Sequence, residues 1–272
     1  MRMKIQTIIS AINTLKLSGK PVCIHMSYKS FGPDGLEGGP AALLDSFLQS
    51  GCTVIVPSHS WVFYVHGPDK DRLIRNAFYK DAPIPKEKLI YTPDSNVIDK
   101  DMGVFAATVV NTKDRIRGNH PLCSFAAIGP DADKIIKTQQ SMDVFAPIKA
   151  IAAQDGFILM AGTKLNKMTA LHLAEQLSGR NMFIRWAYDK NENIIRAQAG
   201  GCSEGFFNLS SALDRYMQKI SVGQSEWACY SADKVLKTAS ALIKADPSIT
   251  HCGDAQCVRC NDAVAGGPEE LQ

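Results

Sequence analysis

Helical and strand patterns alternate through residues 3–61 of this 272-residue chain. Residues 3–17 carry apolar side chains at the spacing of an amphipathic helix, and residues 41–49 form a second helical pattern after Pro40. Residues 21–26 and 52–56 are short runs typical of buried β-strands. Strands separated by helices indicate a parallel α/β unit. The sequence therefore predicts an α/β fold, with a central mixed or largely parallel sheet flanked by helices.

The rest of the chain continues this alternation without an internal repeat or a linker rich in Gly, Ser or Pro. Further strands are expected at residues 122–128, 157–161, 182–188, 194–199 and 226–230, and further helices at 102–110, 131–137, 146–153, 167–175, 210–219 and 232–244. Residues 62–100 are irregular and too long for a simple connection, so we expect them to cover or line something. We expect one domain over residues 1–272, with residues 246–272 as a Cys-containing extension.

Composition excludes several classes of function. The formal net charge is +3, and no run of Lys or Arg supports nucleic-acid binding. No apolar stretch approaches the roughly 20 residues of a membrane helix, and the N-terminus lacks the pattern of a secretory signal peptide. We therefore expect a cytoplasmic protein that binds neither nucleic acid nor membrane, with its eight cysteines mostly reduced.

The strongest candidate for catalysis is a His–Glu pair in the segment Lys167-Met-Thr-Ala-Leu-His-Leu-Ala-Glu175. His172 and Glu175 stand three residues apart, so a helix places both on one face. Histidine is the side chain best suited to moving protons near neutral pH, and a carboxylate beside it can fix its tautomer. The segment follows a predicted strand at 157–161, where α/β proteins usually place a site. The alternative is an ordinary solvated pair on a helix surface.

Other polar positions carry weaker signals. The loop at residues 27–32 follows a strand and precedes a helix, so its backbone N–H groups, two serines and Lys29 could hold a phosphate, or it is a plain polar turn. It matches neither a P-loop nor a dinucleotide fingerprint. His59 lies between two serines, but no Gly-x-Ser-x-Gly elbow supports a hydrolase. His120 precedes a proline and is either a site residue or a turn residue.

A cluster of cysteines lies near the C-terminus. Cys257 and Cys260 have the spacing of a metal knuckle, and His251 and Cys252 could complete four ligands. All four fall within ten residues, whereas structural zinc sites usually combine two separated pairs. Zinc, a redox pair and simple structural thiols all remain open.

Taken together, the segments over residues 3–245 resemble the aminoglycoside 3-N-acetyltransferase family. The shared motifs are His25-Met-Ser-Tyr-Lys-Ser-Phe-Gly32 with Gly38-Gly39, Val56-Pro-Ser-His-Ser-Trp61, Tyr91-Thr-Pro with Met102-Gly103, Asn119-His-Pro-Leu-Cys-Ser-Phe-Ala-Ala-Ile-Gly129, and Thr169-Ala-Leu-His-Leu-Ala-Glu175. The resemblance implies an α/β fold unlike the GNAT acetyltransferases. It also implies transfer of acetyl from acetyl-CoA to an amine through a ternary complex, without a metal, and hence a role in antibiotic resistance.

The resemblance also implies roles for particular residues. His172 is the expected general base, and Glu175 is expected to orient its ring. Acetyl-CoA is expected to contact Ser27, Tyr28, Lys29, Ser30, Phe31, Gly32 and Ser58, with His120 and Thr169 on the acceptor side. Donors to the thioester oxygen are sought among Ser30, Ser58 and Thr169.

The chain departs from the family pattern just before Thr169. Many relatives carry an Asp-Ser-Asn-Thr type of run there, whereas this chain has Asn166-Lys-Met-Thr169. Lys164 and Lys167 argue against an acidic cleft for a polycation, although Asp94, Asp99 and Asp101 could supply one. An aminoglycoside-like amine is the expected acceptor. The alternatives are another amine metabolite, a different acyl group, or a non-catalytic CoA-binding or assembly protein; the oligomeric state, including a homodimer, stays open.

Overall fold

The computed structural model describes residues 2–77 and 87–271. Residues 78–86 of the predicted irregular segment, together with Met1 and Gln272, lie outside the described residues. Among the described residues, no helix is both long enough and apolar enough to cross a membrane.

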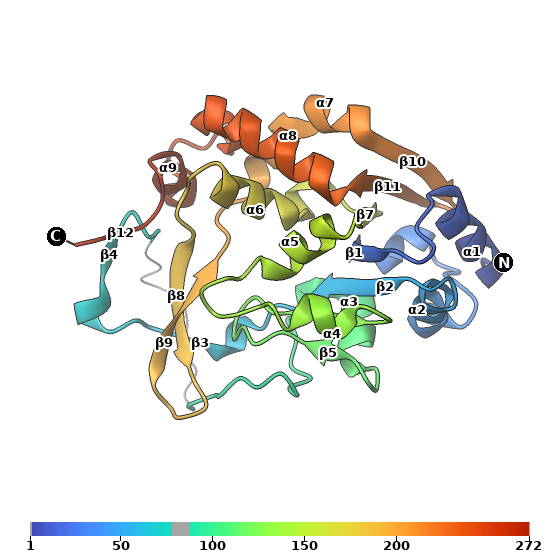
Figure 1. Ribbon diagram of the computed structural model, residues 1–272, viewed down its shortest axis with the longest axis horizontal. Helices are drawn as coiled ribbons and strands as arrows, with labels where there is room; N and C mark the ends of the chain where they lie inside the picture. Colours follow the sequence, from blue (N-terminus) through green and yellow to red (C-terminus); the bar gives the residue numbers. More distant parts are fainter. Residues whose placement is uncertain (1, 78–86, 272) are drawn as a thin grey trace.

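A seven-stranded mixed sheet forms the centre of the molecule, as predicted (Figure 1). Its order is β10 (Met217–Val222), β11 (Ser225–Ser231), β7 (Phe157–Ala161), β1 (Pro21–Met26), β2 (Thr53–Pro57), β6 (Phe125–Ile128) and β5 (Ile116–Arg117). The central strands β7, β1 and β2 are parallel, while β11 and β6 add antiparallel on either side. A strand covered on both faces must be apolar throughout, which explains the continuous runs in β1, β2 and β7.

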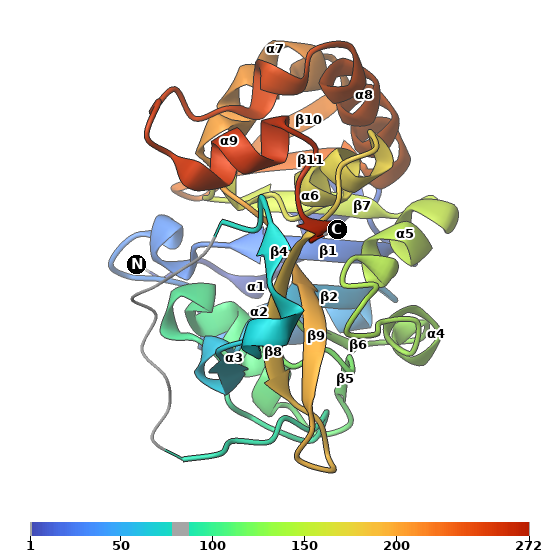
Figure 2. The ribbon, with the colours of Figure 1, turned by 90° about the vertical axis from the view of Figure 1, so that its left-hand side faces the viewer.

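Helices cover both faces of this sheet (Figure 2). One face packs against α1 (Ile5–Thr14), α2 (Gly39–Gln49) and α3 (Gly103–Asn111), and the other against α4 (Ala132–Ile136), α5 (Ala146–Ala153), α6 (Ala170–Leu177) and α8 (Ala232–Ala245). Successive side chains of β1 serve opposite faces: Val22 and Ile24 join the first core, and Cys23 joins the second. The helices and strands that alternate in the N-terminal residues therefore form a sheet with helices on its faces, as the sequence predicts.

A separate ribbon stands at the carboxyl edge of the parallel strands (Figures 1 and 2). It contains β3 (Tyr64–Val65), β8 (Phe183–Tyr188) and β9 (Ile194–Ala199), and β8 pairs antiparallel with both neighbours. The hairpin expected at 182–199 is thus confirmed. A short pair, β4 (Leu73–Ile74) with β12 (Glu269–Glu270), ties the C-terminal segment to residues that follow β3.

Two element predictions were wrong. The helix expected over residues 210–219 stops at Leu213 as the short helix α7 (Ser210–Leu213), and the chain becomes β10 from Met217. Gly223, with a φ of +61°, makes the turn that pairs β10 with β11. The strand expected from Leu122 begins only at Phe125, because residues 122 and 123 instead donate backbone N–H groups to the His120 ring.

Candidate active site

A cavity of about 880 Å³ lies where β1 and β2 end. Residues 24–29 and Pro57 line its floor, and residues 100–106 line a further wall. Met168, Thr169 and His172 enter it from the start of α6, and Arg185 from β8. The crevice at the carboxyl ends of parallel strands is the usual place for a ligand site in an α/β protein. The cavity is therefore the candidate active site.

His172 and Glu175 form a hydrogen-bonded pair in this cavity wall. His172 Nδ1 lies 2.8 Å from Glu175 Oε2. The His172 side chain is 13% exposed and that of Glu175 is 5% exposed. The pair forms because Leu171 and Ala174 turn their side chains into the core and hold α6 against the sheet. The spacing alone would also allow a solvent-exposed pair on the helix surface. The burial of both side chains excludes that alternative.

The Glu175 carboxylate is held by groups from the C-terminal part of the chain. Arg180 Nη1 donates to Glu175 Oε1 at 2.5 Å and to Thr250 Oγ1 at 2.8 Å. Arg180 also donates to the carbonyl of Pro247, and the Thr250 hydroxyl lies 3.2 Å from Glu175 Oε1. A buried charge needs an ion pair and hydrogen bonds to offset its lost hydration. These contacts give the buried carboxylate an ion pair and hydrogen bonds, and they fix the oxygen that meets His172.

The His172 ring is packed on several sides. Phe145 stacks at a centroid distance of 6.1 Å, and Phe206 meets the ring edge-on at 4.8 Å. Gly200, which follows β9, lies so close that an added Cβ would be 2.6 Å from His172 Cδ2 and 2.8 Å from Nε2. The ring therefore has one orientation, with Nδ1 directed at Glu175.

Gly200→Ala is expected to lower kcat by about 10²-fold, because the methyl group must push the imidazole aside and misplacement by roughly 1 Å can cost that much. Steady-state kinetics and a melting curve would be measured together. Gly179→Ala is the matched control: Gly179 has a φ of +108° with nothing near its Cβ, so it should lose stability and keep its kcat. Equal kcat values for Gly200→Ala and wild type would show that the ring tolerates displacement.

Two further histidines line the cavity. Burial lowers the pKa of His25 to about 3, with the charge of His59 adding to the effect. Burial likewise lowers the pKa of His59 to about 4, although Asp101 opposes this shift. Both rings are therefore neutral near pH 7 and resist protonation. Sequence reasoning gave neither a role in the site; their positions at the ends of β1 and β2 were the signal that could have found them.

The loop at 27–32 is divided by a 3₁₀ turn over Tyr28–Phe31. Ser27, Tyr28 and Lys29, which are predicted to contact the acyl donor, line the cavity. Three other residues predicted to contact the acyl donor do not line it. Ser30 Oγ donates to Ser27 O at 2.7 Å and lies 2.6 Å from Ser225 Oγ. Phe31 packs edge-on against Trp227, and Gly32 closes the turn with a φ of +84°. The tight turn therefore leaves these three residues outside the cavity lining.

Ser58 and His120 are also placed outside the cavity lining, whereas Thr169 lies in it. Ser58 is fully buried, and its carbonyl accepts from Arg117 Nη2 at 2.7 Å. His120 Nδ1 accepts the Cys123 N–H at 2.9 Å, so Nε2 is the protonated nitrogen that donates to Gln198 O at 2.9 Å. Burial lowers the pKa of His120 to about 3. Both residues therefore make buried hydrogen bonds within the fold, outside the cavity lining.

The charged side chains of the lining are mostly cationic. Asp101 is the one carboxylate that lines the cavity within the described part of the chain, whereas Asp94 and Asp99 do not line it. The cations of the lining are Lys29, Lys100, Lys167, Arg185 and Arg259. The described lining is therefore not strongly acidic, and its cationic walls favour anionic groups.

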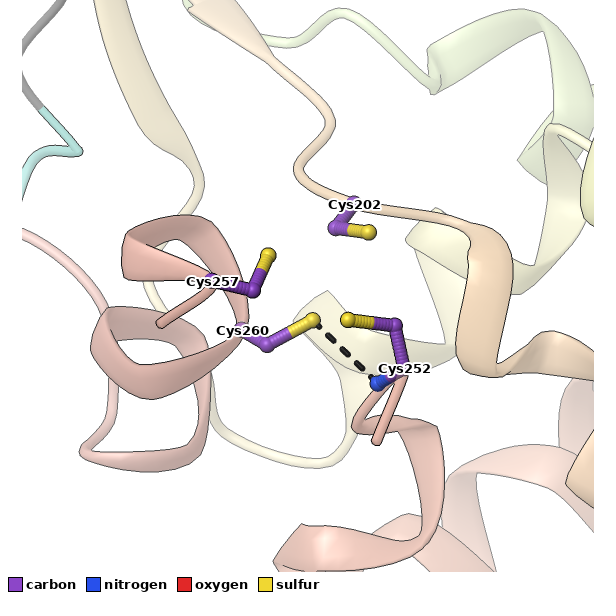
Figure 3. A group of neighbouring side chains, drawn as sticks. All are labelled: Cys202, Cys252, Cys257 and Cys260. Atoms are coloured by element: carbon purple, nitrogen blue, oxygen red, sulfur yellow. Dashed lines mark hydrogen bonds between the residues drawn. The ribbon is translucent and has the colours of Figure 1, made fainter. Parts of the chain in front are cut away.

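The cysteine cluster has a different membership from the predicted one. Cys252, Cys257 and Cys260 come together, but the fourth residue is Cys202, which follows β9 (Figure 3). His251 is turned away, with Nε2 3.0 Å from Asn261 Oδ1 and Nδ1 accepting the Gly253 N–H. His251 therefore does not join the four cysteines.

Comparisons with known proteins agree with this architecture. A sequence profile of the family described as aminoglycoside 3-N-acetyltransferase matches residues 23–244. The aminoglycoside N(3)-acetyltransferase IV of a Salmonella species is 28% identical over 181 residues, which cover 64% of this chain and 59% of the relative. The aminoglycoside N(3)-acetyltransferase IX of Micromonospora chalcea is 30% identical over 165 residues, which cover 59% of this chain and 57% of the relative. The matches thus span less than two thirds of these relatives.

Solved structures share the fold over nearly the whole chain. The crystal structure of the aminoglycoside acetyltransferase AAC(3)-IVa apoenzyme has a TM-score of 0.77 at 23% identity and covers 98% of both chains. A structure of the same enzyme in complex with apramycin has a TM-score of 0.73 at 22% identity, covering 94% of this chain and 98% of that one. YokD of Bacillus subtilis has a TM-score of 0.76 at 19% identity, and the match covers 91% of this chain and 96% of YokD.

Proposed function

The chain belongs to the aminoglycoside 3-N-acetyltransferase family, and we propose that it transfers an acetyl group from acetyl-CoA to an amino group of a small-molecule acceptor. The observation that carries this proposal is the buried His172–Glu175 pair on the wall of the cavity. A histidine held by a carboxylate is the arrangement that removes a proton from a nucleophile.

His172 acts as the general base. Its Nδ1–H donates to the Glu175 carboxylate, which leaves the lone pair on Nε2. An alkylamine is mostly an ammonium ion at neutral pH and must lose a proton before it can attack a thioester. His172 Nε2 takes this proton, directly or through a water, and Glu175 stabilises the resulting imidazolium.

The neighbouring histidines are poorer bases. A base with a pKa near 3 or 4 takes a proton from an ammonium ion much less readily than one near the working pH. His25 and His59 both have pKa values lowered into this range by burial. Neither has a carboxylate within hydrogen-bond distance among the contacts of the described residues, whereas His172 does. The proton therefore goes to His172.

The cavity suits an elongated, anionic acyl donor. Acetyl-CoA supplies the acyl group as a thioester, and its phosphates need cationic or N–H partners. Lys29 and Lys100 stand on neighbouring walls, and Ser27 and Tyr28 add hydroxyl groups beside them. Thr169, at the start of α6 and one turn from His172, is placed to donate to the negative charge that develops on the thioester oxygen.

Aminoglycosides are the first acceptor class to consider, because the curated relatives carry that name. A second candidate is an amine with few positive charges or with an anionic group. Among the described residues of the cavity lining, Asp101 is the one carboxylate and the other charged groups are cations. This lining favours the second class over a polycation.

The test is CoA-thiol release from acetyl-CoA over a panel of aminoglycosides, neutral amino sugars and amines that bear a phosphate or carboxylate. We expect acetylation of an amine, with kcat/KM highest for an acceptor of low positive charge. A preference for aminoglycosides would support the proposed acetyl transfer and exclude amines of low positive charge as the preferred acceptors. No release with any amine, despite saturable binding of acetyl-CoA, would overturn the proposed function.

A further inference from the structure

Four cysteines from three separate segments converge on one point beside the cavity wall (Figure 3). Cys202 comes from the loop after β9, Cys252 from the chain after α8, and Cys257 and Cys260 from the start of α9 (Val258–Val264). Their Sγ atoms all lie within 4.8 Å of one another, and each is a free thiol. We propose that these four thiols, as thiolates, bind a structural Zn²⁺ ion.

The spacing of the sulfurs matches a single tetrahedral ion. Zn–S bonds of about 2.3 Å in a tetrahedron place the sulfurs about 3.8 Å apart, within the separation found here. Four sulfurs in a tetrahedron select zinc or iron. An iron–sulfur cluster holds its cysteines around a cage of several atoms and so needs wider separation. A disulfide would explain the approach of two of these cysteines but not of all four.

The surroundings of the sulfurs are those of a ligand set. Cys202 and Cys260 are buried, while Cys252 and Cys257 are partly buried. The Cys252 backbone N–H points at Cys260 Sγ, 3.4 Å away. Such N–H groups stabilise the negative charge of a metal-bound thiolate. The Cys257-x2-Cys260 spacing supplies one pair of ligands from a single turn, and Cys202 with Cys252 supplies the second.

Contacts other than those of the cysteines hold the two distant segments together. Gly205, shortly after Cys202, lies so close that an added Cβ would be 2.1 Å from Thr250 O. Asn208 Nδ2 also donates to Ile249 O at 2.9 Å. The ligands are therefore arranged before the ion binds, which limits the entropy lost on binding.

The ion would fix part of the cavity wall. Ser203, adjacent to Cys202, and Arg259, between Cys257 and Cys260, both line the cavity. Zinc would therefore hold Arg259 against the loop that also carries Gly200. The site has no open coordination position, so its role is structural, and the expectation that acetyl transfer needs no metal stays a prediction.

Metal content of the 272-residue chain tests the proposal. We expect one Zn²⁺ per chain by elemental analysis after expression with added zinc, and loss of that zinc in Cys202→Ser and Cys257→Ser. His251→Gln should keep its zinc, because His251 faces Asn261. Cys52→Ser is the matched control: its hydroxyl can still donate to Leu17 O, so it should also keep zinc. Zinc lost from His251→Gln and retained in Cys202→Ser would overturn the ligand set.

Two measurements on the wild-type chain decide the matter even if the ligand variants fail to fold. Replacement of zinc by Co²⁺ should give the intense visible charge-transfer and d–d absorption of a tetrahedral thiolate site. Chelation should lower the melting temperature, and added Zn²⁺ should restore it. A metal-free protein that takes up neither ion, bound iron in place of zinc, or a mass showing two disulfides would each refute the zinc site.

Discussion

Replacing His172 by glutamine is expected to lower kcat by about 10²–10⁴-fold, the usual contribution of a well-placed general base. Glutamine has a similar length and can still hydrogen-bond to Glu175, which lies 2.8 Å from the native ring, but it cannot accept a proton. The loss should therefore fall on kcat, with little change in KM for acetyl-CoA. CoA-thiol release at saturating acetyl-CoA, with the best acceptor of the panel, measures it.

His66→Gln serves as the matched control, because His66 lies outside the cavity lining and its loss should leave kcat within about twofold. His172→Ala adds a second readout: it removes the ring altogether, so added imidazole should restore part of the rate. Unchanged turnover in both His172 variants, with a large loss in His59→Gln, would show that His59 rather than His172 is the general base.

The central fold could be predicted because its strands are covered on both sides. Such strands must be apolar along their whole length, so β1, β2 and β7 stand out in the sequence between amphipathic helices. The edge of the sheet lacks this signal. β10 alternates buried and exposed residues only partly, and its identity depends on pairing with β11 across Gly223. That long-range pairing decided against the helix expected there.

The site was predictable only where its residues are close together in the sequence. His172 and Glu175 could be paired from helical spacing, but their burial and the roles of Arg180 and Thr250 depend on tertiary packing. Cys202 is far in sequence from the other three cysteines, so spacing directed attention to His251 instead. In the loop after β1, spacing could not show that a 3₁₀ turn takes Ser30 and Phe31 out of the cavity.

Arg180→Leu is expected to lower the free energy of unfolding by about 3–5 kcal/mol, the usual cost of removing one partner from a buried ion pair. Glu175 would lose its ion-pair partner in a site where its carboxylate has almost no contact with water. The contacts of Arg180 with Thr250 and with the carbonyl of Pro247 would be lost as well. Urea denaturation followed by circular dichroism measures the change. Lys237→Leu, which breaks an exposed pair with Asp233, should cost less than about 1 kcal/mol.

A double-mutant cycle separates the ion pair from the packing around it. Glu175→Gln alone leaves the Arg180 charge buried without its carboxylate, so it should also be strongly destabilising. The double variant, Glu175→Gln with Arg180→Leu, buries neither charge and should be more stable than the sum of the two single changes predicts. Because the double variant still lacks the carboxylate that holds His172 Nδ1, its kcat should stay low even where its stability recovers. Additive losses of stability would show that the two charges are solvated independently and that the pair does not hold Glu175 in place.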